Sequence, residues 1–110
     1  MALVKELYRV TSDFSKEETF GLVDQMRRAA VLIPANLAEG HTRQRVGEYR
    51  YFVSVALGSV AELETHILLS DDLAFLVSSD TDNLLKQLDE IGKMLRGLAQ
   101  YLDRRRQSTT

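Results

Sequence analysis

The chain has 110 residues and a net charge of −2, with 45% hydrophobic and 27% charged residues. This length suits a single domain, and this composition is typical of a globular protein with a core, which excludes a largely disordered chain. The absence of cysteine excludes disulfides, thiolate catalysis and zinc–cysteine sites. The small net charge conceals segregation, because residues 62–90 hold eight acids against Lys86, whereas residues 93–106 hold five bases against Asp103.

Helical periodicity predicts four helices, near residues 2–12, 16–39, 45–74 and 80–105. In three of them apolar residues recur every three or four positions. These stripes are Leu3, Leu7, Val10 and Phe14; Tyr49, Val53, Ala56, Val60, Leu63 and Ile67; and Leu84, Leu88, Ile91, Leu95, Leu98 and Leu102. A mean step of about 3.5 residues is typical of helices that pack nearly parallel, and short connections make neighbours antiparallel. We therefore predict an all-α, up-down-up-down, antiparallel four-helix bundle at residues 1–106, followed by a disordered tail at 107–110.

The predicted second helix is apolar on more than one side. Its core stripe is Leu22, Met26, Ala29, Ile33 and Leu37, and a second apolar face comprises Phe20, Val31, Pro34 and Ala38. A helix that is apolar on two sides is buried on two sides, so the second face is the candidate interface of a homo-oligomer. Pro34 also removes the hydrogen bond to the carbonyl of Ala30 and is expected to kink this helix.

Capping signals mark several helix ends. Ser15 and Glu18 form a capping box at the start of the second helix. Gly40 is placed to end that helix as a left-handed C-cap. The run Arg104, Arg105 and Arg106 ends the fourth helix, where cations favour the helix dipole.

No motif for catalysis is present, since the chain has neither a Gly-x-Ser-x-Gly elbow nor a phosphate-binding glycine loop. Glu62, Glu64 and His66 share one predicted helix, but Leu63 stands three residues before the histidine, so the Glu-x-x-His pattern of di-iron bundles is missing. We interpret these three as outer-face residues. The expectation is a protein without enzymatic activity, cofactor, metal or small-molecule substrate.

Targeting signals are also missing. The first residues lack the basic region and long apolar core of a signal peptide. The longest nearly apolar run that we identify, residues 29–38, is far shorter than the ~20 residues that span a bilayer. A cytoplasmic location without membrane contact is therefore expected.

Five arginines within 24 residues are candidate phosphate contacts: Arg27, Arg28, Arg43, Arg45 and Arg50. In an antiparallel bundle the last three lie near one end, with the first two roughly two or three turns further along the second helix. The alternative is that these arginines pair with acids inside the protein or at a subunit interface.

Residues 25–40, Gln-Met-Arg-Arg-Ala-Ala-Val-Leu-Ile-Pro-Ala-Asn-Leu-Ala-Glu-Gly, strongly resemble the signature of the bacterial four helix bundle proteins. These are also called 23S rRNA intervening-sequence proteins, because some are encoded inside insertions in ribosomal RNA genes. Residues 7–11 with Phe14, Gly58-Ser59 and residues 62–64 also match. The chain departs from the family pattern at Ser15, where Pro is usual, and at Leu32, where Ser is usual. It also begins near the middle of the family's longer first helix.

The resemblance implies a four-helix bundle that assembles as a ring-like homopentamer, in a family without an established enzymatic activity. Relatives that accompany diversity-generating reverse transcriptases suggest nucleic-acid binding. The leading hypothesis is therefore a non-enzymatic homopentameric scaffold that binds RNA or DNA through its arginines, without sequence preference. The alternative is a protein–protein adaptor that binds no nucleic acid.

Overall fold

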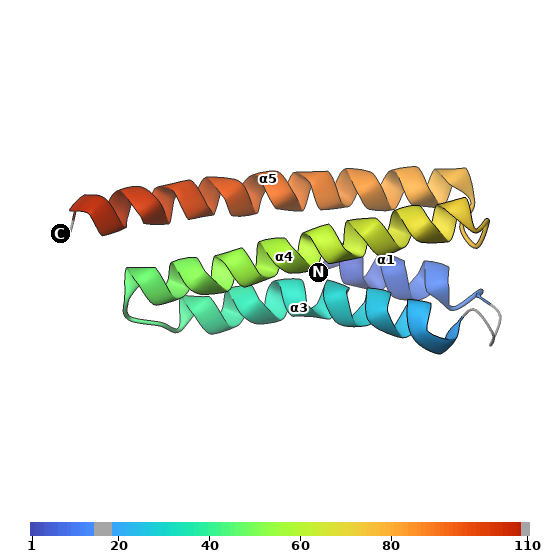
Figure 1. The fold of residues 1–110 in the computed structure, drawn as a ribbon, viewed down its shortest axis with the longest axis horizontal. Helices are drawn as coiled ribbons and strands as arrows, with labels where there is room; N and C mark the ends of the chain where they lie inside the picture. Colours follow the sequence, from blue (N-terminus) through green and yellow to red (C-terminus); the bar gives the residue numbers. More distant parts are fainter. Residues whose placement is uncertain (15–18, 109–110) are drawn as a thin grey trace.

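The computed structural model describes residues 1–14 and 19–108. This part of the chain is all-helical and has no strand. Its elements are α1 (Ala2–Thr11), the short π-helical turn η1 (Thr19–Val23), α3 (Asp24–His41), α4 (Val46–Asp72) and α5 (Ser78–Ser108). Successive α-helices run in opposite directions along a rod of 52 × 21 × 19 Å (Figure 1). The predicted all-α, up-down-up-down arrangement is thus confirmed.

Most helix ends lie within three residues of their predicted positions. The largest difference is at the second helix, which was predicted to begin near residue 16, whereas α3 begins at Asp24 after η1. The fourth helix begins at Ser78 and continues to Ser108, so residues 107 and 108 of the predicted tail are helical. Arginine and glutamine are good helix formers, which favours this continuation. The predicted capping box of Ser15 and Glu18 lies outside the described residues.

The predicted apolar stripes form the core. On α4 the residues from Val53 to Ile67 in the stripe are buried, and the fully buried large side chains come from all four helices. These are Leu3, Leu7, Met26, Ile33, Leu63, Ile67, Leu84 and Leu88, together with smaller neighbours. On α5, however, Ile91 and Leu98 are only half-buried.

The half-burial of Ile91 and Leu98 follows from the length of α1. Helix α4 packs against both α3 and α5, and α1 contacts α3 and α5. Because α1 has only ten residues, it runs beside only part of its longer partners (Figure 1). The rod therefore has a four-helix half, which contains α1, and a three-helix half, which contains the α3–α4 loop and the end of α5.

An apolar groove opens where α1 begins. Its volume is about 320 Å³, and it is lined mainly by Met1, Ala2, Leu3, Leu37, Ile91, Met94 and Leu95. Met94 is 74% exposed there.

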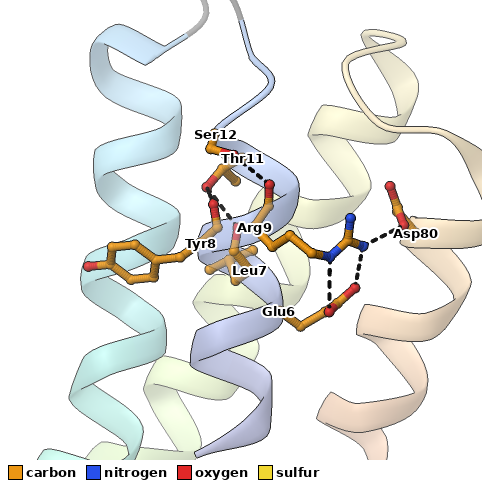
Figure 2. Close-up of polar contacts among 7 residues, drawn as sticks. All are labelled: Glu6, Leu7, Tyr8, Arg9, Thr11, Ser12 and Asp80. Carbon is orange, nitrogen blue, oxygen red and sulfur yellow. Dashed lines mark hydrogen bonds and ion pairs between the residues drawn. The ribbon is translucent and has the colours of Figure 1, made fainter.

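Polar contacts fasten α1 to its neighbours (Figure 2). Arg9 Nη2 donates to Glu6 Oε1 over 2.6 Å and to Asp80 Oδ1 over 3.4 Å, which joins α1 to α5. The hydrogen bond from Arg9 lowers the pKa of the Glu6 carboxyl below its ordinary value. On the other side, Arg27 of α3 donates from Nε to the buried Thr11 Oγ1 over 3.0 Å, and its guanidinium lies 4.5 Å from the Tyr8 ring centre.

The prediction that Gly40 forms a left-handed C-cap is wrong. Gly40 is helical, and α3 ends at the C-cap Thr42 with right-handed φ and ψ of −78° and −12°. Glycine is needed there because a Cβ would lie 2.8 Å from Phe52 Cβ and 2.9 Å from Tyr49 Cδ1. Gly40 therefore permits the close approach of α3 to α4.

The left-handed cap occurs instead at the end of α4. Ala74 has a φ of 62°. The N–H of Phe75 donates to the carbonyl of Ser70 over 2.9 Å, and the N–H of Ala74 donates to that of Asp71 over 3.0 Å. This pair of bonds defines a Schellman motif, in which glycine is the usual left-handed residue.

Pro34 is accommodated within α3, which continues for seven further residues to His41. The proline lacks the N–H that would bond to the Ala30 carbonyl. Two residues after the proline, Asn36 Nδ2 donates to the carbonyl of Leu32 over 2.8 Å. This side-chain hydrogen bond is an additional contact with the backbone of the turn that precedes Pro34.

Candidate nucleic-acid interface

Six arginines gather at the end of the three-helix half. The α3–α4 loop, the start of α4 and the end of α5 meet there (Figure 1). We call this set the basic end: Arg43, Arg45, Arg50, Arg104, Arg105 and Arg106. The acids on the same segments, residues 39–50 and 103–108, are Glu39, Glu48 and Asp103, which leaves three positive charges in excess.

Two of the predicted arginines at this end are engaged within the bundle. Arg43 forms an ion pair with Glu39, and its guanidinium lies 5.0 Å from the Phe52 ring centre. Arg50 donates from Nε to Asp103 Oδ1 over 2.9 Å, which joins α4 to α5. Both side chains thus serve packing as well as surface charge.

Arg45 is different. It is exposed, and it makes no side-chain hydrogen bond or ion pair with the described part of the chain. It is also the N-cap residue of α4, where no side chain caps the first N–H groups. Those N–H groups add positive potential beside the arginine.

The arginines at the end of α5 belong to the same surface. Arg106 lies against the first turn of α4, because a Cβ on Gly47 would be 3.4 Å from its Cζ. From the sequence alone, this run is interpreted chiefly as a favourable helix terminus. Their place beside Arg45 was not predicted, although the antiparallel arrangement predicted for the last two helices brings the end of one near the start of the other.

A hollow of about 140 Å³ lies among these residues, and we call it the basic hollow. Its lining combines cations with aromatic rings: Arg43, Gln44, Arg45, Val46, Tyr49, Tyr101, Leu102 and Arg105. The guanidinium of Arg105 lies 5.9 Å from the Tyr101 ring centre. The ring of Tyr49 packs edge-on against His41 with centres 5.9 Å apart.

Arg27 and Arg28 do not join this surface. They lie in the first turns of α3, and fifteen residues separate Arg28 from Arg43, which is roughly 20 Å along a helix. Arg27 fastens α1 as described above, whereas Arg28 is exposed and unpaired within the described residues. The predicted set of five arginines is therefore two groups.

The opposite end of the rod is acidic. The end of α4, the following loop and the start of α5 contribute Asp71, Asp72, Asp80 and Asp82, and residues 71–82 contain no Lys or Arg. The rod is 52 Å long, whereas electrostatic screening acts over about 8 Å at physiological salt. The acidic end therefore does not neutralise the basic end.

The candidate oligomer interface remains on the surface of the single chain. Val31 is 42% exposed, Ala38 is exposed and Pro34 is half-buried. The side chain of Phe20 lies outside the described residues. Further exposed apolar side chains occur on α4, at Tyr51, Leu68 and Leu69.

The residues around His66 form no metal site. In the described ranges, no group of three His, Asp or Glu side chains could hold a metal ion. His66 Nε2 lies 3.6 Å from Glu62 Oε1, and its buried Nδ1 has no partner among these residues. Its side chain is 18% exposed, so the expectation that it lies on the outer face is wrong.

Helix α4 is long and apolar enough to cross a membrane, with a mean hydropathy of 1.4 in its most apolar window. This segment was not predicted as a candidate span from the sequence. Its buried face, from Val53 to Ile67, forms the centre of the bundle core. Central helices of bundles pass the same test of length and composition, which makes it a weak indication of a span.

A sequence profile of the family described as "23S rRNA-intervening sequence protein" matches residues 1–97. The chain belongs to this family. The recognition made from residues 25–40 is thereby confirmed. None of the curated proteins compared with the chain matches it.

Family membership agrees with the fold of a solved relative. A protein of unknown function from the S23 ribosomal protein family of Bacteroides thetaiotaomicron superposes with a TM-score of 0.79 at 19% identity, over 89% of each chain. At this identity the likeness shows the fold alone. The likeness therefore carries no information about what the basic end or the basic hollow binds. The role of both surfaces has to be inferred from the residues of this family member itself.

Proposed function

We propose that this protein is a non-enzymatic, self-assembling helical scaffold, a homopentamer, that binds RNA or DNA through its basic end without sequence preference. The observation that supports this most directly is the excess of arginine at one end of the rod, with Arg45 and Arg104 exposed and unpaired within the described residues. Phosphates require cationic donors rather than a particular fold.

Self-assembly would place several copies of a low-affinity binding site in one particle and so raise the overall affinity. Exposed apolar side chains on α3 and α4, among them Val31 and Tyr51, supply surface for contacts between copies. A ring with cyclic symmetry and bundle axes along the ring axis brings every basic end to the same side. Contacts that are weak singly then act together.

The test compares two double variants with the same loss of charge. Arg45→Ala/Arg104→Ala removes two exposed arginines from the basic end. Arg28→Ala/Lys86→Ala removes two exposed cations from the other half, near the starts of α3 and α5. Binding to labelled single-stranded and duplex 20-mers is measured by fluorescence anisotropy at several salt concentrations, with sedimentation to establish the oligomeric state.

We expect the first variant to weaken binding and to flatten the salt dependence by about 0.7–0.9 in slope for each lost phosphate contact. The second variant should bind like the wild type. Equal losses in both variants would mean that net charge alone governs binding. No binding by an intact oligomer near 50 mM salt would favour the adaptor alternative, and sedimentation at the monomer mass of 12.5 kDa would refute assembly.

A further inference from the structure

The basic hollow differs from an ordinary cationic surface because aromatic rings line it beside the arginines. Its volume of about 140 Å³ is well below the roughly 300–1,000 Å³ of pockets that enclose drug-sized molecules. A space of this size suits one planar ring. It is contributed by three segments: the α3–α4 loop, the first turn of α4 and the last turns of α5.

The ring of Tyr101 is accessible from this hollow. Its side chain, near the end of α5, is 49% exposed. Burial of this ring would lower the free energy of the protein further, because it would remove apolar surface from water. The lining of the hollow also includes apolar side chains, the buried Leu102 and the half-buried Val46. An exposed aromatic ring beside apolar side chains is a surface on which a second planar ring can stack.

The cations are placed around the same ring. Arg105 lies over Tyr101, while Arg43 and Arg45 line the hollow from the α3–α4 loop. A planar base joined to a phosphate presents both chemistries at once, a π-face for the ring and an anion for the guanidinium groups.

We infer that the basic hollow binds one unpaired nucleotide, with its base stacked on Tyr101 and its phosphate held by Arg45, so that the protein prefers single-stranded over duplex nucleic acid. This inference rests on the proposed function and adds the strand state of the ligand. In a duplex the bases are stacked and paired, so only the phosphates reach the arginines. In a single strand both contacts form together.

Four probes of similar length separate these contributions: a (dA)12 strand, an oligo(A) RNA of 12 residues, a 12-base-pair duplex and an abasic 12-mer that keeps the phosphates without the bases. Binding of each to the intact oligomer is measured by fluorescence anisotropy near 50 mM salt. Stacking of a base on an aromatic side chain contributes about 5- to 150-fold in affinity. We expect wild-type protein to bind both single strands at least fivefold more tightly than the abasic strand.

Variants of Tyr101 test the ring directly. Tyr101→Leu removes the π-face and should abolish the preference for bases, whereas Tyr101→Phe keeps the face and should retain it. Tyr8→Leu is the matched control, because Tyr8 is 42% exposed on α1 and does not line the hollow. Arg45→Ala should weaken all four probes by similar factors, since each contains phosphates.

The outcomes distinguish this inference from the proposed function. If no probe binds, the proposed function fails. If all probes bind with equal affinity, or if Tyr101→Leu keeps the preference for bases, the inference alone is refuted. Circular dichroism and sedimentation of Tyr101→Phe and Tyr101→Leu show whether each variant retains the fold and the assembly; should Tyr101→Leu lose them, the wild-type comparison of (dA)12 with the abasic strand still decides.

Discussion

Both halves of the rod contain arginines that join helices and arginines that remain unpaired within the described residues, but only the four-helix half uses them to hold α1. In the four-helix half, Arg9 and Arg27 connect α1 to α5 and α3, and their guanidinium groups are occupied by Glu6, Asp80 and Thr11. In the three-helix half there is no α1 to fasten, and Arg45 and Arg104 remain exposed and unpaired within the described residues. The comparison shows that a cation becomes structural where an acceptor on another helix lies within reach, as Asp103 does for Arg50, and remains available to a ligand where none does.

The largest expected change in the free energy of unfolding comes from a substitution on the apolar face of α1, which packs against the core. Leu7 is fully buried in the four-helix half. Leu7→Ala should lower the free energy of unfolding by about 2–5 kcal/mol, because the transfer term and the cavity add. Thermal denaturation followed by circular dichroism measures this. Met94→Ala on α5 is the control, since Met94 is 74% exposed, and a comparable loss there would contradict the burial of Leu7 as the cause.

The three-helix half depends on the close approach of α3 and α4 at Gly40. Gly40→Ala should cost about 1–3 kcal/mol, because its Cβ would overlap Phe52 and Tyr49. Gly58→Ala is the matched control, since no atom lies within 4 Å of its added Cβ. There the alanine should stabilise α4 by about 0.5–1 kcal/mol. Similar melting temperatures for the two variants would show that the contact at Gly40 relaxes without cost.

The adjacent residues Arg27 and Arg28 of the four-helix half allow an arginine that joins two helices to be compared with one that is exposed to solvent. Arg27→Ala should destabilise by about 1–2 kcal/mol, since it loses the bond to buried Thr11 and the contact with the Tyr8 ring. Arg28→Ala should change stability by less than about 0.5 kcal/mol, as is usual for an exposed residue. Chemical denaturation measures the free energy of unfolding of both variants. Equal losses would show that the contacts of Arg27 with α1 do not stabilise the protein.

A substitution at Ala74, the left-handed residue that caps α4 at the acidic end, is expected to stabilise the protein. Ala74→Gly should raise the free energy of unfolding by about 1 kcal/mol, because an alanine with φ of 62° is strained and a glycine is not. In a domain of this size that corresponds to a rise of roughly 4–8 °C in melting temperature. A fall in melting temperature would mean that the flexibility of glycine in the unfolded chain outweighs the relief of strain.

The smallest expected effect concerns Glu6 and Arg9. The pKa of Glu6 is lowered in the folded protein, chiefly by the hydrogen bond from Arg9. Its stabilising effect is therefore present above the unfolded pKa of about 4.3 and is lost as the pH falls through the lower folded value. Glu6→Gln should melt slightly below the wild type at pH 7, and the difference should shrink as the pH falls below 4. A difference that does not change with pH would exclude this ion pair as its cause.

The interface was only partly predictable because it combines segments that are distant in sequence. Antiparallel packing correctly predicted Arg43, Arg45 and Arg50 at one end. Arg104, Arg105 and Arg106 were recognised only as a favourable helix terminus, although Arg106 lies against Gly47 of α4. Arg27 and Arg28 lie further along α3, as expected, but the contacts of Arg27 with Thr11 and Tyr8 of α1 were not predicted.

The sequence by itself determined the helices, their antiparallel order and the residues that face the core, because an apolar period near 3.6 and short connections are local properties of the chain. The tertiary structure decided what depends on relative lengths. A ten-residue α1 leaves Ile91 and Leu98 half-buried. The register of α3 against α4 makes Gly40 a contact residue rather than a cap. The register of α4 against α5 creates the basic hollow, because it brings Arg45 and Tyr101 together across more than fifty residues of sequence.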